Sequence, residues 1–465
     1  MYSKNIKNCE QFTEQYDLVI VGGNVIDVND NTIKKRNIGI CQNKIEIVTS
    51  KYISGHKTID ATGLMVAPGF IDFNSHVDGN LYSAQCLVRQ GGTTTLGGLR
   101  HINGRVIRKI EEEGFVVNQG FFISHSFTLR SAAGIVDRYK PAARSEIKFM
   151  KDLAERFLEH GAYGIYFGLE FVPGTSIDEM LALAKVAKEH DKVISVHIRK
   201  DGPEGLQYFD EVIQTAELTG VKVQMIQLVY NIGIGGAMEK GLGIIEEARQ
   251  RGLDITGDSG VYDAFTACIG TSIFDPGWEK EYGKYGVNDL LISSGIYMGQ
   301  YCTKDLFHYL RQEFPSTLVT AFVCDSDAII SAMKKSYIFI STNAADGPHY
   351  PGMGAPEVSG TYPKLIGQYV RQKKAIGLIE AIKKITLLPA ERFGLVNKGA
   401  IEEGMDADIA IFDYDHIIDC ATFMGQGEPD APPKGIHYVL VNGQIVVKDG
   451  ALTQNLFAGK LLRKY

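Results

Sequence analysis

One β-α-β unit stands out at residues 161–197, which read GAYGIYFGLEFVPGTSIDEMLALAKVAKEHDKVISVH. Apolar residues crowd its two ends, at 161–168 and 192–197, whereas 176–190 repeats its apolar residues at the spacing of a helix buried on one face. A near-continuous apolar strand is typical of a parallel sheet that helices cover on both faces. The unit therefore predicts an α/β fold with a parallel sheet.

The same alternation continues on both sides of this unit. Further helices are expected at 146–160, 206–219 and 237–251, and further strands at 66–73, 93–98, 120–124, 222–228, 253–257 and 337–341. About eight strands favour a closed (β/α)8 barrel of the TIM type over an open sheet. Residues 266–335 break the alternation between the seventh and eighth strands. We interpret them as an insertion and leave open whether they form a lid.

The two ends of the chain differ from the centre, because they consist of short strands and turns. Strands are expected at 16–26, 37–48, 407–412 and 437–447, the last with an Asn-Gly hairpin signal. We infer one small β-sandwich domain that both termini build together. The predicted division assigns 1–65 and 399–465 to this domain and 66–398 to a catalytic barrel.

The composition excludes several classes of protein. The 465 residues are 45% hydrophobic and 22% charged, which excludes a disordered chain, and a net charge of −7 offers no cationic surface for nucleic acid. Seven scattered Cys residues without a C-x-x-C pair argue against a disulfide framework or a zinc ribbon. No signal peptide or membrane-spanning run is recognised. We expect a cytoplasmic protein that acts on a small molecule, and homo-oligomer formation stays open.

Polar residues gather where the predicted strands end, which is the edge where barrel enzymes carry their chemistry. Asn74 and His76 follow the first strand two residues apart and therefore point to the same side. The later strands end at or near His125, Glu170, His197, Gln227, Asp258 and Asp346. Several imidazoles and carboxylates at one rim predict a site that holds a divalent metal and activates water.

A series of short motifs runs along nearly the whole chain. They are PGFID at 68–72 followed by x-x-x-His, QGGTTT at 90–95, SHSFTLR at 124–130, GLEFVPG at 168–174, VHIR at 196–199, DGPH at 346–349, GTYP at 360–363 and LPAxxFGL at 388–395. In this order they resemble the amidohydrolase superfamily, in its N-acyl-D-amino-acid deacylase (D-aminoacylase) branch. The resemblance implies a metal-dependent barrel with a composite sheet domain.

This sequence departs from the pattern of metal ligands that the resemblance implies. It has Asn74-Ser75-His76 where the family has His-x-His, and Gln227 stands at the position of the strand-six His. The bridging Cys of the family falls near 99–101, where no Cys is present. Neutral amides are poorer zinc ligands than imidazole or thiolate. A complete two-metal site is therefore not expected.

Three implied ligands remain, namely His76, His197 and Asp346. They imply a mononuclear site, with one zinc ion as the expected cofactor, if they converge around it. Asn74, His101, His125, Glu170 and Gln227 are the additional candidate site residues. The competing interpretation of His125 is a hydrogen-bonded structural histidine, and that of Glu170 is a polar residue of the rim.

Arg199, Tyr262 and Glu357 are the residues expected to contact the substrate. The deacylases place an Arg shortly before Gly-Thr-Phe-Pro, where it binds the carboxylate of the acylated amino acid. Glu357 stands at that position here. Because an acid repels a carboxylate, we expect a substrate that is neutral or cationic at that end.

The resemblance implies a hydrolase that cleaves a non-peptide C–N bond in an acylated amine, an amino-acid derivative or a cyclic amide. His76 and His197 would hold the metal, and Asp346 would take the proton of the attacking water and pass it to the leaving nitrogen. The alternative is a metal-depleted barrel that acts as an isomerase, a cyclase or a small-molecule binding protein. Asn74 and the missing Cys favour this alternative, whereas the three retained ligands oppose it.

Overall fold

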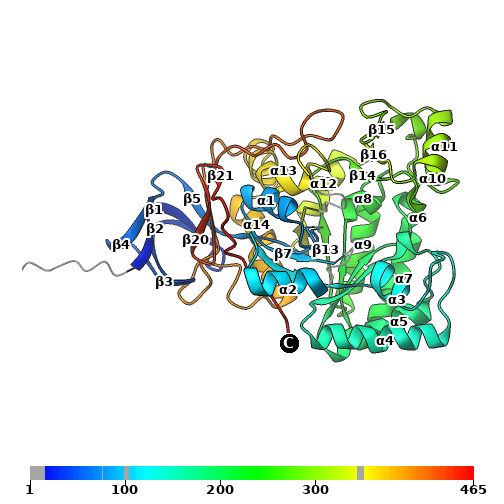
Figure 1. The fold of residues 1–465 in the computed structure, drawn as a ribbon, viewed down its shortest axis with the longest axis horizontal. Helices are drawn as coiled ribbons and strands as arrows, with labels where there is room; N and C mark the ends of the chain where they lie inside the picture. The colour runs from blue at the N-terminus through cyan, green and yellow to red at the C-terminus, as the bar shows by residue number, and fades with distance from the viewer. Residues whose placement is uncertain (1–15, 76, 99–103, 343–349) are drawn as a thin grey trace, which may run out of the picture.

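The computed structural model describes residues 16–75, 77–98, 104–342 and 350–465. Figure 1 shows a small β domain at one end of the molecule, a central barrel, and a group of short strands and helices at the opposite end. None of the helices in the described ranges is long and apolar enough to span a membrane.

The barrel consists of parallel strands in chain order. One sheet contains β6 (Phe70–Asp72), β7 (Gly92–Gly97) and β8 (Asn118–Phe121), and the other contains β9 (Ile123–Ser124), β10 (Gly164–Gly168), β11 (Val193–His197), β12 (Lys222–Met225), β13 (Ile255–Ser259) and β17 (Ile338–Ile340). A single residue separates β8 from β9, so the two form the third barrel strand. The first and last strands meet where Thr342 Oγ1 donates to Asp72 Oδ2 over 2.7 Å. The expected (β/α)8 barrel is confirmed.

Helices connect successive barrel strands and cover their outer face. The predicted helices are found as α4 (Arg144–Glu159), α5 (Ile177–Glu189), α7 (Phe209–Thr219) and α9 (Ala237–Gln250). Ser176 fixes the start of α5, because its Oγ accepts a hydrogen bond from Glu179 N over 3.2 Å. Gly220 ends α7 in the left-handed conformation, at φ 65°.

Shorter helices complete the barrel and its loops. They are α1 (Leu81–Arg89), α2 (Gly104–Glu113), η1 (His125–Leu129), α3 (Arg130–Ala132), η2 (Leu169–Phe171), α6 (Gly202–Gly205), η3 (Leu206–Tyr208), α8 (Leu228–Ile232), α12 (Ser326–Met333), α13 (Glu357–Lys364), η6 (Leu365–Gln372), α14 (Leu378–Lys384) and α15 (Leu387–Phe393).

An additional segment lies between β13 and β17, where the sequence predicts an insertion. It contains a separate antiparallel sheet in the order β14-β16-β15, made of β14 (Phe265–Cys268), β15 (Leu290–Ile292) and β16 (Leu318–Ala321). The same segment contains four short helices: η4 (Ser272–Phe274), α10 (Trp278–Glu281), η5 (Val287–Asp289) and α11 (Lys304–Glu313).

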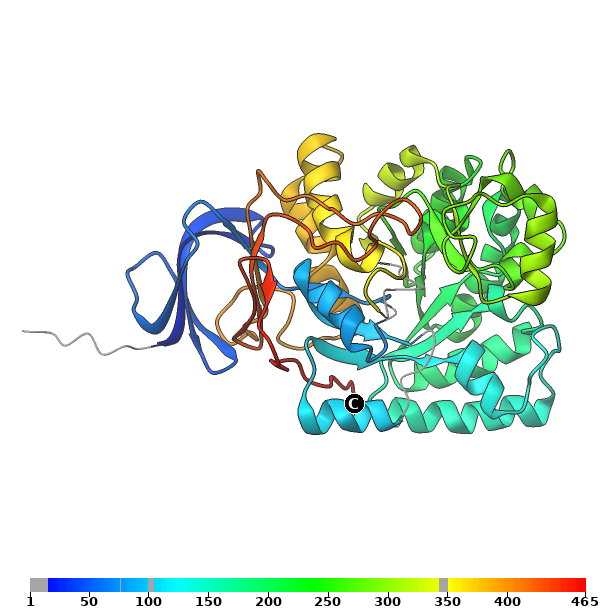
Figure 2. The same ribbon diagram turned by 45° about the horizontal axis from the view of Figure 1, so that its top comes forward.

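The small domain is a nine-stranded sheet built from both ends of the chain. Its N-terminal strands are β1 (Tyr16–Asp27), β2 (Thr32–Cys41), β3 (Lys44–Thr49), β4 (Gly55–Asp60) and β5 (Met65–Pro68), and its C-terminal strands are β18 (Ile409–Phe412), β19 (Ile436–Val441), β20 (Gln444–Lys448) and β21 (Ala451–Leu452). The two groups join where β5 pairs with β18. Figure 2 shows the blue and red strands side by side. The small domain has a hydrophobic core of its own. We propose the domain boundaries that the sequence predicts, namely 1–65 and 399–465 for this domain and 66–398 for the barrel.

Candidate functional site

A cavity of about 630 Å³ lies at the carboxyl ends of the barrel strands. Its lining includes Glu170, which follows β10, His197, which ends β11, and Gln227, which follows β12. Residues of the insertion, from Phe265 to Ile273, complete the wall. The cavity therefore lies where a barrel enzyme carries its active site.

Three buried side chains converge at one end of this cavity: Glu170, His197 and Asp201. His197 Nε2 lies 2.9 Å from Glu170 Oε2, and one ligand atom of each residue lies within 4.8 Å of the others. Asn231 Nδ2 donates to Asp201 Oδ1 and also lies 3.1 Å from His197 Nε2. One imidazole nitrogen and two carboxylates form a donor set that suits a divalent metal with an open position for water.

Gln227 orients the imidazole of His197. Its Oε1 lies 2.5 Å from His197 Nδ1, and because an amide oxygen only accepts, it favours the tautomer with the proton on Nδ1. His197 Nε2 is thereby left to face Glu170. The backbone at Gln227 has φ 61°, and Gln227 N donates to Asp258 Oδ1 over 3.1 Å. Gln227 therefore positions a ligand rather than supplying one.

The charges of this cluster also suit a bound cation. Burial raises the pKa of Asp201 well above its usual range, and the adjacent Glu170 carboxylate raises it further. Burial lowers the pKa of His197, against the opposing effect of Asp201. Two neighbouring buried carboxylates repel each other, and a divalent metal between them would stabilise both charged forms. The residues present therefore fit a metal ion.

Replacing Gln227 by Leu should lower the metal affinity by about 10- to 100-fold, because the substitution removes the acceptor that fixes His197. Titration of the protein against a coloured chelator measures this affinity. Gln207→Leu is the matched control, since Gln207 is exposed and bonds only to the carbonyl of Glu204 among the described residues. An unchanged affinity in Gln227→Leu would show that the contact does not support a metal ligand.

Three residues of the predicted site, His76, His101 and Asp346, lie outside the described residues. Their proposed roles as metal ligands, and the proposed proton transfer by Asp346, remain predictions.

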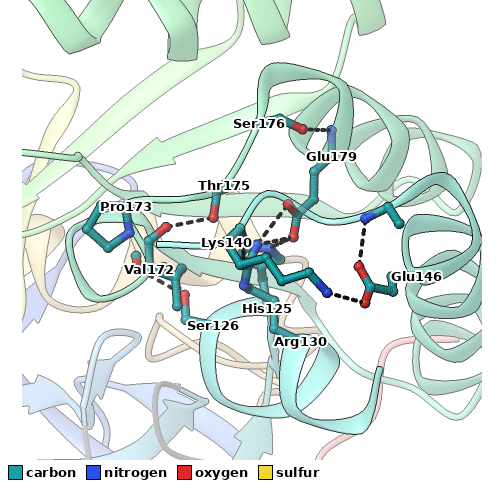
Figure 3. Close-up of polar contacts among 12 residues, drawn as sticks. His125, Ser126, Arg130, Lys140, Glu146, Val172, Pro173, Thr175, Ser176 and Glu179 are labelled. Atoms are coloured by element: carbon teal, nitrogen blue, oxygen red, sulfur yellow. Dashed lines mark hydrogen bonds and ion pairs between the residues drawn. The ribbon is translucent and has the colours of Figure 1, made fainter. Parts of the chain in front are cut away.

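His125 lies outside the cavity lining and takes part in a buried network with Glu179 and Arg130. Its Nε2 lies 2.8 Å from Glu179 Oε1, and Arg130 Nη1 binds both oxygens of Glu179 at 2.8 Å (Figure 3). Burial lowers the pKa of His125, so the neutral imidazole is favoured. The geometry gives His125 a structural contact with α5 in place of the metal ligation considered from the sequence.

Asn74 lies between two buried aspartates at the strand-one end of the barrel. Its Nδ2 donates to Asp258 Oδ1 over 3.3 Å, and its backbone N lies 3.4 Å from Asp72 Oδ1. Burial raises the pKa of Asp72 and of Asp258 to about 6. The Asn74 amide is therefore used as a hydrogen-bond donor that supports a carboxylate.

The three expected substrate contacts divide into one residue at the cavity and two away from it. Glu357 lines the cavity and is buried. Arg199 binds the Glu211 carboxylate, at 3.0 and 2.8 Å, and Tyr262 donates to Asp419 Oδ2 over 3.3 Å. Among the described residues, neither Arg199 nor Tyr262 belongs to the cavity lining. The structure thus does not bring these two side chains to the site.

Three further residues at the site, Asp201, Asn231 and Tyr282, were not expected from the sequence. Asp201 lies four residues after His197, in the loop before α6. It was not considered because only residues at or next to the strand ends were taken as candidates. Tyr282, from the insertion, donates to Asp201 Oδ2 over 2.6 Å. An acidic residue shortly after a histidine at a strand end could have indicated Asp201 as a candidate ligand. Nothing in the sequence marked Tyr282.

Comparisons with known proteins agree with this architecture. Residues 348–447 match the amidohydrolase family. Over 97% of this chain and 98% of its own length, a D-aminoacylase from Alcaligenes xylosoxydans xylosoxydans is 26% identical. The resemblance to the D-aminoacylase-like branch of the amidohydrolases is thereby confirmed.

Two solved structures share the fold. One is an N-acyl-D-glutamate deacylase from Bordetella bronchiseptica, described in complex with zinc and a phosphonate mimic of the tetrahedral intermediate; its TM-score is 0.83 at 22% identity, covering 97% of this chain and all of that one. The other is a D-aminoacylase whose binuclear metal centre is described as having one-metal activation and second-metal attenuation. Its TM-score is 0.84 at 24% identity, with the same coverage.

Proposed function

We propose that this protein is a metal-dependent amidohydrolase, similar to the N-acyl-D-amino-acid deacylases, that hydrolyses a non-peptide C–N bond of a small amino-acid-like substrate. The observation that carries the proposal is the buried cluster of Glu170, His197 and Asp201 in a cavity at the carboxyl end of the barrel. The relatives named above are deacylases, and they do not favour the alternative of an isomerase, a cyclase or a binding protein.

One divalent ion, with zinc as the proposed metal, would be held by His197, Glu170 and Asp201. Such an ion supplies Lewis-acid activation of the carbonyl and of a water when it is bound. Gln227 keeps the His197 proton on Nδ1, and Asn231 supports Asp201. His76 stays a proposed additional ligand. Asp346 stays the proposed acceptor of the proton from the attacking water, which it returns to the leaving nitrogen.

Glu357 and Tyr230 support a substrate that is neutral or cationic at one end. Both side chains are buried and line the cavity. The Tyr230 hydroxyl has no hydrogen-bond partner within the described part of the chain, and its ring contacts that of Phe265, with centroids 6.4 Å apart. A carboxylate next to Glu357 would be repelled, whereas a neutral acyl group or an ammonium group would be tolerated.

We also propose that the protein acts in the cytoplasm. The cysteines that the structure describes are free, which suits a reducing compartment. A small molecule is the proposed partner. Assembly into a homo-oligomer stays open.

Hydrolysis of amides by the metal-loaded protein tests the function directly. Protein purified without chelators or an affinity metal should contain about one equivalent of divalent metal per chain by elemental analysis. It should release free amine from N-acetylated amino acids with a neutral or cationic side chain faster than from N-acetyl-D-aspartate or N-acetyl-D-glutamate. Near-zero metal that added zinc, manganese or cobalt cannot restore, together with no amine release, would exclude the proposed function.

A further inference from the structure

The small domain extends one connecting segment over the face of the barrel that carries the cavity. This segment, residues 419–430, lies between β18 and β19, and we call it the strap. Figures 1 and 2 show it leaving the small domain and running past α13 toward the insertion. At its start, Asp419 Oδ2 lies 3.5 Å from Lys364 Nζ at the end of α13. The strap therefore follows the helix that begins with Glu357 of the cavity lining.

The middle of the strap packs against the loop after β13 and against the insertion. The Phe423 ring lies 5.8 Å from that of Tyr262, which follows β13, and 5.2 Å from that of Phe322, which follows β16. Gly425 approaches the insertion so closely that a Cβ on it would lie 3.2 Å from the Gly299 Cα. Phe423 is itself buried. These contacts fix the strap in place over the barrel.

The end of the strap joins the segments that follow the first and the last barrel strands. Asp430 Oδ2 accepts hydrogen bonds from the Tyr82 hydroxyl, in α1, and from Gly352 N, the latter over 2.9 Å. Burial and the hydrogen bond with Asp430 raise the pKa of Tyr82 to about 12, so its hydroxyl remains a donor. Hydrogen bonds to a carboxylate are stronger than those between neutral groups. One carboxylate thus connects α1 with the chain that leads into α13.

The chain before α13 depends on the strap, because its own sequence does little to fix its backbone. Gly352 and Gly354 adopt the left-handed conformation, at φ 74° and 99°, and glycine restricts the backbone least of all residues. Asp430 holds the backbone N of Gly352, and Met424 Sδ accepts a hydrogen bond from Gly354 N over 2.9 Å. Two side chains of the strap therefore anchor this glycine-rich stretch.

The anchored stretch is close in sequence to residues of the proposed active site. Glu357, which lines the cavity, follows Gly352 by five residues. Asp346, the proposed proton acceptor, precedes Gly352 by six residues. A displacement of about 1 Å in a reacting geometry can slow a reaction about 100-fold. A contact that holds this stretch in place can thus control the rate of the reaction without touching the substrate.

We propose that Asp430 is a positioning residue of the active site, which holds the 350–357 segment where hydrolysis requires it and is braced by Tyr82. This inference rests on the proposed amidohydrolase function and gives the small domain a part in it. Among the described residues, Asp430 belongs neither to the cavity lining nor to the cluster of metal ligands. Its removal should therefore slow the reaction and leave metal binding intact.

The rate of amine release by the metal-loaded protein tests this role, with the N-acetylated amino acid that reacts fastest as the substrate. Asp430→Ala should lower kcat about 10- to 100-fold, change KM less than about threefold and keep the metal content per chain. Asp430→Asn should recover part of the rate, because its side-chain oxygen still accepts a hydrogen bond. Tyr82→Phe should lower kcat by less than Asp430→Ala, since Gly352 keeps its acceptor. Glu428→Ala is the matched control, because Glu428 is an exposed acid on the same strap, and it should keep the full rate.

Hydrogen–deuterium exchange supplies a second readout that needs no substrate. The amides of residues 350–357 should exchange faster in Asp430→Ala than in the unaltered protein or in Glu428→Ala. In a protein that hydrolyses amides, the proposal requires both the slower reaction and the faster exchange, and either change alone overturns it. Tyr82→Phe supplies the same two readouts if Asp430→Ala does not fold. Release of no amine by the unaltered protein rejects the proposed function, and the exchange alone then decides whether Asp430 anchors the segment.

Discussion

The His197→Ala variant is expected to lose its bound metal and to hydrolyse amides about a thousandfold more slowly than the unaltered protein. A metal that polarises a carbonyl stabilises the transition state by several kcal/mol, and each 1.36 kcal/mol corresponds to a factor of ten in rate. His197 supplies the only imidazole of the cluster that the structure describes. Its loss leaves Glu170 and Asp201 as two carboxylates without a nitrogen donor, a weaker set for zinc.

Elemental analysis per chain and the rate of amine release measure the two effects in the same preparation. His190→Ala is the matched control, because His190 is the residue at the end of α5 and lies outside the cavity lining. It should keep both metal and activity. Asp201→Asn should also lose metal, since it removes one of the two carboxylate charges. One equivalent of metal retained in His197→Ala would contradict the cluster as the metal site and would direct attention to His76 and Asp346.

The barrel could be predicted from the sequence because its signal is periodic. The strands at 161–168 and 192–197 and the helix at 176–190 were expected from apolar spacing alone, and the structure has β10, β11 and α5 there. A buried parallel strand leaves little ambiguity when helices of the right length separate it from the next. The third barrel strand was less regular than expected, since it is interrupted between β8 and β9.

The candidate site was only partly predictable, because strand ends do not fix where a side chain points. His197 ends β11 and Glu170 follows β10, and both line the cavity as expected. His125 follows β9 in the same way, but the helical turn η1 begins at that residue and places its ring against Glu179 on the outer helix α5. Asp201 shows the reverse case. It lies in the loop after β11 and not at the strand end, yet the fold of that loop brings its carboxylate next to Glu170 and His197.

Arg130, Glu179 and His125 form a buried contact whose loss should strongly destabilise the protein. Burial alone would raise the pKa of Glu179, but its hydrogen bonds with His125 and Arg130 and the charge of Arg130 lower it overall. We assign the charge of Glu179 to its pair with Arg130, since burial keeps His125 neutral. Both side chains of the ion pair are almost fully inaccessible to solvent. Removing one partner of such a pair leaves an uncompensated buried charge.

Glu179→Ala should therefore lower the free energy of unfolding by about 3–5 kcal/mol, as measured by urea denaturation followed by circular dichroism. Glu189→Ala is the matched control on the same helix, where an exposed side chain should cost less than about 0.5 kcal/mol. The pKa of Glu179 is lower in the folded state, so its contribution should be present above the ordinary pKa of glutamate and be lost as the pH falls through the lowered value. In Glu179→Ala this part of the acid dependence should disappear.

A double variant, Arg130→Met with Glu179→Leu, should be more stable than Glu179→Ala, because apolar side chains leave no buried charge. Equal stability of Glu179→Ala and Glu189→Ala would mean that the pair contributes nothing to the stability of the fold.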